Sequence, residues 1–313
     1  MGDDLPDFRE VQDHFGFARP APIEKDWYIT RAIAALTAMD AGPFALVFGG
    51  GTCLARAHRL VRRMSEDVDF KIVPREGTPS SRGTRRKQLG DLRDRVTETL
   101  QRVGFLFNAD DPAHVSSRNE SRYTIYRLPH GPPGREEEGL RPAIQLELTY
   151  ARLRQPAVTL PVSSFVAEAY RRPPEVPSIA CVSVTETAAE KLVSLTRRTA
   201  AELAGMSRDP DPTLVRHIYD LHLIRGHLDR EAFGELAWAI AGEDAEAFRN
   251  QHPAYHADVA AETGRALDAL RTDPLIRDRY AHFVSAMVYG ERPIFDDAIT
   301  TVIGLAGPLI RRR

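Results

Sequence analysis

The chain has 313 residues, 42% of them hydrophobic and 27% charged, which are values of a folded globular protein and exclude a disordered chain. Its formal net charge of −2 excludes a protein that is basic throughout, so any contact with RNA would need a local basic patch. Because no apolar run reaches membrane-spanning length and the N-terminus lacks a signal-peptide pattern, we expect a cytoplasmic protein with no membrane partner.

The first predicted elements alternate between helix and strand. Residues 21–42 carry apolar side chains at helical spacing and end at a glycine, which is typical of an amphipathic helix. The apolar run at residues 43–48 predicts a short strand, and a run of glycines follows it. From Leu54 to Met64 the helical spacing returns, and arginines occupy the other side of this predicted helix: Arg56, Arg59, Arg62 and Arg63.

The sequence DVDFKIV, residues 67–73, changes to a period of two. Its apolar side chains face one way and its charged side chains, Asp67 and Asp69 among them, face the other, as in a half-buried strand. A charged helix is predicted to end near Gly104.

Two more alternating segments, residues 121–128 and 141–150, predict strands that are separated by the turn-rich residues 129–139. In the second of these strands, Glu147 lies on the polar face.

These elements predict an α+β (α/β) protein of two domains. Residues 1–22 would form an N-terminal extension, and residues 23–170 a domain with a sheet flanked by helices. The proline-rich residues 170–180 are typical of a linker. Residues 176–313 show almost only helical patterns and predict a helical C-terminal domain.

Asp67 and Asp69 are the first candidates for chemistry. Two carboxylates at positions i and i+2 of a strand project from one face and can hold a divalent cation, and magnesium commonly takes one or two carboxylates together with substrate phosphates. By itself this spacing also occurs on ordinary solvent-exposed strands, so a plain acidic surface remains an alternative.

The glycine run between the strand and the next helix is the second candidate. Backbone amides of Gly50 and Gly51 can approach phosphate oxygens there, and Thr52 is placed to cap the helix and to donate its hydroxyl to a phosphate. A simple tight turn is the alternative. Glu147 would supply a third carboxylate for a two-magnesium site or would be an ordinary surface acid.

The combination resembles the nucleotidyltransferase fold and, more narrowly, the AbiEii/AbiGii/MenT family of nucleotidyltransferase toxins. The family's GGT…SEDxD pattern is matched by Gly50, Gly51 and Thr52 and by the later group Ser65, Glu66, Asp67 and Asp69. Blocks similar to the family's further motifs occur at residues 24–26, 190–192 and 216–221, so the resemblance covers most of the chain.

This resemblance implies a mixed sheet in the first domain and a magnesium-dependent transfer of a nucleotide from a nucleoside triphosphate, with release of pyrophosphate. It implies that Asp67 and Asp69 bind magnesium, that Lys191 contacts the triphosphate, and that Asp220 is a required acid. Gly50, Gly51, Thr52 and Ser65 would complete the nucleotide site. It further implies that the acceptor is the 3′ end of tRNA and that a cognate antitoxin protein is a partner.

Other readings remain open at this point. The acceptor could be a protein or a small molecule, or the fold could serve a non-catalytic nucleotide-binding module. Cations between Arg82 and Arg95 could contact an RNA backbone or could form a solvated helix face balanced by neighbouring acids.

Overall fold

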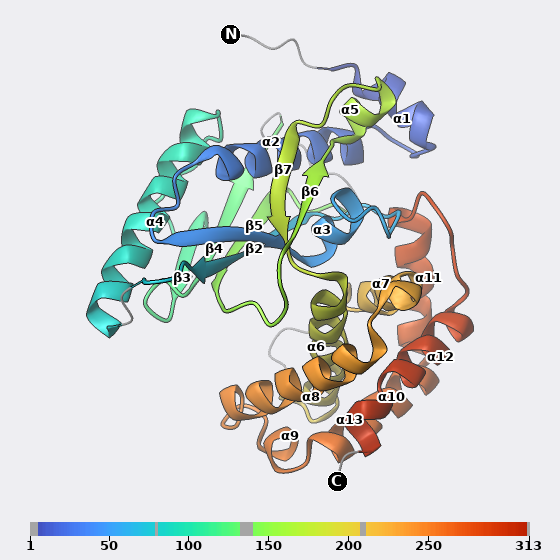
Figure 1. The fold of residues 1–313 in the computed structure, drawn as a ribbon. Coiled ribbons are helices and arrows are strands. Elements are labelled where there is room, and N and C mark those ends of the chain that lie inside the picture. The colour runs from blue at the N-terminus through green and yellow to red at the C-terminus, as the bar shows by residue number, and fades with distance from the viewer. Residues whose placement is uncertain (1–5, 79–80, 132–139, 207–210, 312–313) are drawn as a thin grey trace. The chain divides into compact units, whose positions relative to one another are not determined.

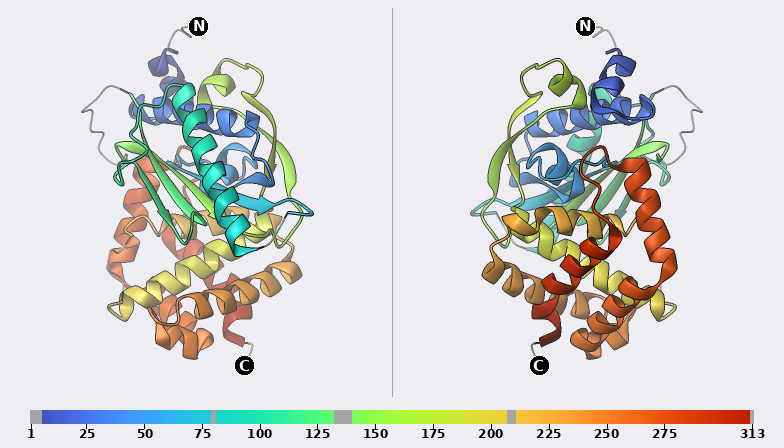
Figure 2. Two further views of the ribbon diagram at one scale, coloured as in Figure 1. Left: turned by 90° about the vertical axis from the view of Figure 1, so that its left-hand side faces the viewer. Right: turned by 90° about the vertical axis from the view of Figure 1, so that its right-hand side faces the viewer.

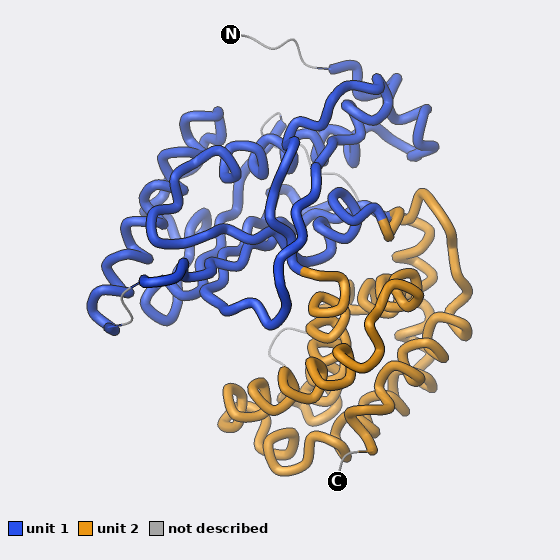
Figure 3. Tube along the Cα trace, in the orientation of Figure 1, with its two compact units in different colours: residues 1–59, 63–182 blue, residues 60–62, 183–313 orange. Residues whose placement is uncertain are grey.

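The computed structural model describes residues 6–78, 81–131, 140–206 and 211–311. The chain divides into two compact units (Figure 3). One unit takes the residues up to 59 together with residues 63–182, and the other takes residues 60–62 and 183–313. Most of the turn-rich segment predicted at residues 129–139 lies outside the described residues.

The described part of the first unit contains a seven-stranded mixed sheet with the strand order β3-β4-β5-β2-β1-β7-β6 (Figure 1). The neighbours β2 and β5 run parallel, as do β1 and β7, and the other neighbours run antiparallel. The strands are β1 (Phe44–Gly49), β2 (Asp67–Pro74), β3 (Val115–Arg118), β4 (Tyr123–Pro129), β5 (Ala143–Tyr150), β6 (Val158–Val162) and β7 (Val176–Cys181). The helices are α1 (Phe8–Phe15), α2 (Ala21–Ala38), α3 (Gly50–Arg56), α4 (Arg82–Arg102) and α5 (Phe165–Ala169).

The two faces of this sheet differ in chemistry. Val68 of β2, Leu146 of β5 and Tyr126 of β4 are paired across the strands and therefore point to the same face, where all three are buried. The Tyr126 hydroxyl donates to the carbonyl of Arg93 in α4 at 2.9 Å, so α4 lies on this face, alongside α2 (Figures 1 and 2). The predicted alternation of residues 67–73 is confirmed, and their carboxylates point to the opposite face.

The helix predicted from Leu54 to Met64 is wrong beyond Arg56, where α3 ends. Arg59 has a φ of 57°, a left-handed conformation that interrupts a right-handed helix. Arg56 and Arg63 are buried rather than solvated. The backbone turn precedes Arg63, whereas Arg56 is buried as part of α3 itself.

Residues 176–181, which lie in the range predicted to be helical, form strand β7 beside β1. β7 pairs with a strand more than a hundred residues earlier in the chain, and its sequence VPSIAC contains a proline and alternates weakly. The short strands β3 and β6 were also not predicted.

The second unit is helical in its described part, as predicted. Five of its described helices follow residue 247. None of the described helices is long and apolar enough to cross a membrane. The helices are α6 (Val184–Leu203), α7 (Arg216–Ile224), the 3-10 helix η1 (Arg225–His227), α8 (Arg230–Ala247), α9 (Pro253–Ala257), α10 (Val259–Thr272), α11 (Pro274–Met287), α12 (Phe295–Leu305) and α13 (Gly307–Arg311).

Candidate active site

Three neighbouring strands bring predicted site residues into one row across the sheet. Gly49, the last residue of β1, is paired with Asp69 of β2, and Asp69 is paired with Glu147 of β5. Paired side chains point to the same face, so Asp69 and Glu147 lie together on the face away from α4. Asp67 precedes Asp69 by two residues and shares that face.

The glycine turn begins directly after this row. Gly50 has a φ of 70°, and a Cβ added to it would lie 1.8 Å from Oδ2 of Asp69. The Asp69 carboxylate therefore lies immediately over the turn, and glycine is required both for the backbone conformation and for this close approach.

Gly51 has a similar close approach to polar side chains. A Cβ added there would lie 2.3 Å from a guanidinium nitrogen of Arg63 and 3.2 Å from the hydroxyl of Ser65. Gly51 and Ser65, both predicted as nucleotide-binding residues, thus lie next to each other, and Arg63 joins them.

Arg63 is a residue that the helical pattern misplaced. It is only 2% exposed, and its Nη1 donates to the carbonyl of Met64 at 2.9 Å. A guanidinium above a glycine turn is suited to phosphate oxygens, because it offers several donors in a fixed plane. Its position two residues before Ser65 was the signal available in the sequence.

Thr52 does not cap the helix, so that expectation is wrong. The N-cap of α3 is Gly49, without a side-chain bond, and Thr52 lies inside the helix with 1% of its surface exposed. Its hydroxyl donates to the carbonyl of Asp67, which uses its single proton. Thr52 therefore ties α3 to the start of β2 and helps to place Asp67 relative to the glycine turn.

Asp67 is bound by an arginine that the sequence did not single out. Nη1 of Arg141, which lies just before β5, is 2.5 Å from Oδ1 of Asp67. The Asp67 side chain is 12% exposed and the Arg141 side chain is 37% exposed. This carboxylate is thus largely buried and held in place beside a partly exposed cation.

Glu147 is held by two donors. The Tyr123 hydroxyl donates to its Oε2 at 2.8 Å and the Gln145 amide to its Oε1 at 2.5 Å. Burial and the negative charges of Glu147 and Asp69 raise the pKa of Tyr123, so the phenol keeps its proton and remains a donor.

A magnesium site here would rest on Asp67 and Asp69. The described residues contain no group of three or more His, Cys, Asp or Glu side chains close enough to hold a metal ion together. Two oxygen ligands from one strand face still fit magnesium, which usually completes its shell with water and substrate phosphates.

The second unit contains the other two predicted residues as a buried ion pair. Nζ of Lys191 in α6 lies 2.9 Å from Oδ2 of Asp220 in α7, and the two side chains are 7% and 0% exposed. Each of these two buried charges thus has an opposite charge as its partner. Burial and the charge of Lys191 lower the pKa of His217 well below its usual value, so this imidazole stays neutral.

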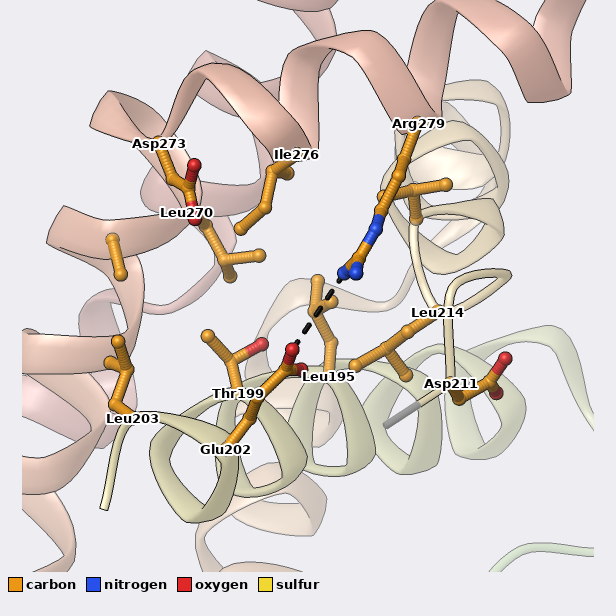
Figure 4. Close-up of a pocket in the computed structure, with 12 residues that line it drawn as sticks. Leu195, Thr199, Glu202, Leu203, Asp211, Leu214, Leu270, Asp273, Ile276 and Arg279 are labelled. Carbon is orange, nitrogen blue, oxygen red and sulfur yellow. Dashed lines mark ion pairs between the residues drawn. The ribbon is translucent and has the colours of Figure 1, made fainter. Parts of the chain in front are cut away.

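The second unit also has a pocket formed by α6, α10, α11 and the segment before α7 (Figure 4). Leu195, Leu214 and Leu270 form its apolar lining, and Arg279 lies 3.7 Å from Glu202 across it. None of the predicted site residues lines this pocket, so it is separate from the chemistry argued so far.

The basic stretch between Arg82 and Arg95 lies on α4, on the sheet face opposite to the carboxylates. Arg82 binds Glu120 at 2.7 Å and Arg93 binds Asp94 at 2.8 Å. At least these two cations have acidic partners on the surface, as in a solvated helix face.

Comparison with known proteins agrees with the fold. The family model described as nucleotidyl transferase AbiEii toxin, type IV TA system, matches residues 35–301. Among solved structures, MenT4, a nucleotidyltransferase toxin from Mycobacterium tuberculosis H37Rv, is similar with a TM-score of 0.52 and 17% identity, over 99% of this chain and 91% of that chain. No curated protein matches. Since the family model spans most of the chain, the protein belongs to the AbiEii family and is a nucleotidyltransferase toxin of the type IV toxin–antitoxin class.

Proposed function

We propose that this nucleotidyltransferase uses magnesium to transfer a nucleotide from a nucleoside triphosphate to the 3′ acceptor end of tRNA. The observation that carries the proposal is the row Gly49, Asp69 and Glu147, which brings a glycine turn and carboxylates to the same place on one sheet face. A triphosphate needs backbone or cationic hydrogen-bond donors, and a metal ion needs carboxylates. Here the glycine turn and the carboxylates are adjacent.

In this proposal Asp67 and Asp69 hold magnesium, and the triphosphate lies over Gly50, Gly51 and Ser65. Bound magnesium would neutralise charge on the phosphates and on the departing pyrophosphate. The acceptor hydroxyl oxygen forms a bond to the α-phosphorus while the bond from that phosphorus to pyrophosphate breaks. The hydroxyl proton passes to a carboxylate of this group, for which Glu147 is the candidate.

Thr52 belongs to the proposed nucleotide site through its hold on the backbone of Asp67. Lys191 and Asp220 are proposed as a required pair, with Lys191 as a cation for the triphosphate and Asp220 as the carboxylate that keeps it charged and oriented. What supports a required pair is the 2.9 Å contact between Nζ of Lys191 and Oδ2 of Asp220, with side chains 7% and 0% exposed, since loss of either partner would leave a buried charge uncompensated.

Membership in a type IV toxin–antitoxin family implies an antitoxin as the partner of this protein. The choice of tRNA as acceptor follows from the family resemblance of the motifs, and it makes blocked aminoacylation the expected cause of toxicity. A cytoplasmic site of action is part of the same proposal, because tRNA is aminoacylated and used in the cytoplasm.

The test is a label-transfer reaction. The purified protein is incubated with magnesium, each α-labelled nucleoside triphosphate in turn, and total RNA. We expect label in the tRNA band with at least one nucleotide, lost when EDTA is added. Asp67→Asn and Asp69→Asn should abolish transfer, whereas the matched control Asp110→Asn, at an exposed loop aspartate, should retain it. Label on a protein or a small molecule instead of tRNA would refute the proposed acceptor, and absence of any transfer would refute the reaction.

A further inference from the structure

A buried cluster at the start of strands β2 and β5 lies beside the proposed metal site and has no role in it so far. Lys25 of α2 is 0% exposed, and its Nζ lies 2.5 Å from Oε1 of Glu66. Glu66 immediately precedes Asp67, the first residue of β2, and Arg141 lies two residues before the first residue of β5. Because β2 and β5 are parallel neighbours, these positions meet at the same edge of the sheet.

Lys25 and Glu66 together hold both polar backbone atoms of Arg141. Nζ of Lys25 donates to the Arg141 carbonyl at 2.7 Å, and the Arg141 amide donates to Oε1 of Glu66 at 2.7 Å. The backbone of Arg141 is therefore fixed by a buried ion pair, and its side chain starts from a defined point.

The cluster does not have the character of a simple structural ion pair. Burial lowers the pKa of Lys25 although Glu66 and Asp67 oppose that shift, so the pair stays in the interior at an energetic cost. Arg141 differs from its two holders, because its side chain is 37% exposed and ends on Oδ1 of Asp67. In this cluster the buried charges of Lys25 and Glu66 hold one partly exposed guanidinium against Asp67, the proposed metal ligand.

A guanidinium and a divalent cation on the same carboxylate repel each other. Metal binding at Asp67 would therefore weaken the contact with Arg141, and the nearest anion of a bound substrate would become its better partner. Guanidinium groups bind phosphate through two parallel hydrogen bonds, which suits a triphosphate beside Asp67.

We propose that Arg141 is a nucleotide-binding residue that exchanges Asp67 for the triphosphate when metal and nucleotide bind, with Lys25 and Glu66 as its positioning residues. The inference rests on the proposed function, because it assumes that Asp67 binds metal and that the substrate is a nucleoside triphosphate.

Isothermal titration calorimetry on the full chain tests the exchange. The exchange predicts that loss of the Arg141 side chain raises the affinity for the metal ion alone and lowers the affinity for the nucleotide. Arg141→Ala should bind manganese alone about two- to fivefold more tightly, since the metal no longer displaces a guanidinium from Asp67. The same variant should bind a non-hydrolysable nucleoside triphosphate with magnesium about tenfold or more weakly, since a charged hydrogen-bond donor is lost. The matched control Arg277→Ala removes an arginine that binds Asp296 at 2.6 Å and should change neither affinity.

The positioning residues need a second pair of variants. Glu66→Gln keeps an oxygen acceptor and should retain nucleotide affinity within about threefold, whereas Glu66→Leu removes it and should lose affinity as Arg141→Ala does. Thermal unfolding separates this loss from instability. If Glu66→Leu does not fold, the two affinities of Arg141→Ala decide alone.

The possible results separate this inference from the proposed function. A wild-type protein that binds neither manganese nor magnesium nucleotide refutes both. A wild-type protein that binds both ligands, with an Arg141→Ala variant in which both affinities fall or neither changes, refutes the exchange and leaves the proposed function intact.

Discussion

Replacement of Gly50 by alanine is the most direct test of the site geometry. The added Cβ would lie 1.8 Å from Oδ2, 2.6 Å from Cγ and 3.0 Å from Cβ of Asp69, and these distances are shorter than van der Waals contact. Asp69 has a short side chain, so its carboxylate must rotate away from the turn. The proposed metal ligand would then be displaced by more than an ångström.

The effect of Gly50→Ala has two separable parts, a loss of stability and a loss of activity. The left-handed conformation, with a φ of 70°, should cost about 1–2 kcal/mol of stability once a Cβ is present. The clash adds to this cost, because rotation of the carboxylate relieves the contact with Oδ2 but not the 3.0 Å approach to Cβ of Asp69. Function should suffer far more, since a displacement of about 1 Å in a reacting group can reduce the rate about a hundredfold.

Gly77 provides the matched control. Its φ is 78°, and an added Cβ would meet no described atom within 4 Å. Gly77→Ala should therefore lose only the conformational part of the stability and keep full activity. Urea unfolding measures the first quantity, and manganese binding with label transfer measures the second. Equal activity of Gly50→Ala and Gly77→Ala would refute the placement of Asp69 over the glycine turn.

Two further predictions concern buried charges. Burial raises the pKa of Asp26 from its ordinary 3.8 to about 6, so the folded state holds this proton more tightly than the unfolded state. The stability that this proton contributes is present below the unfolded pKa and is lost as the pH rises through 6. On going from pH 7.5 to pH 4, the free energy of unfolding of the wild type should therefore rise by up to about 3 kcal/mol relative to that of Asp26→Asn, as measured by urea unfolding. A difference between the two proteins that does not change with pH would contradict this prediction. Asp220→Ala should cost about 3–5 kcal/mol, because it removes the carboxylate that the buried Lys191 ammonium contacts. The double variant Lys191→Met, Asp220→Leu should recover most of that stability without recovering transfer, and recovered transfer would contradict the proposed role of the pair.

The strands that carry the carboxylates could be predicted because their information is local. Residues 67–72 alternate between charged and apolar side chains, and one face of β2 must be buried under α4, so the direction of Asp67 and Asp69 followed from the sequence. The proximity of Glu147 to Asp69 depends on the parallel register of β2 and β5. No local pattern sets the register between strands so far apart, so the sequence alone could not place Glu147 beside Asp69.

The arginines were harder to predict for a different reason. Arg56 and Arg63 occur at positions that a helical wheel assigns to solvent, and their burial depends on partners that are distant in sequence. Nε of Arg56 lies 3.2 Å from Oδ1 of Asp26, and its guanidinium carbon lies 3.9 Å from the centre of the Phe165 ring. A planar cation can be buried by stacking and by pairing at once, so charge alone is a poor guide to exposure for arginine.

Two of the four lysines of this arginine-rich chain show where the difference between an ammonium and a guanidinium has consequences. Lys25 and Lys191 are both buried, and each ammonium contacts one carboxylate oxygen in a confined space. A guanidinium is wider, carries its donors in a plane, and needs a surface on which to stack, as Arg56 does on Phe165. A compact ammonium can instead donate in three directions from one point, which lets Lys25 bind Glu66 and the Arg141 carbonyl together. An arginine at either position would have to push its carboxylate away, so a compact ammonium suits these two buried sites, whereas Lys87 is exposed on α4 and shows that lysine alone does not identify them.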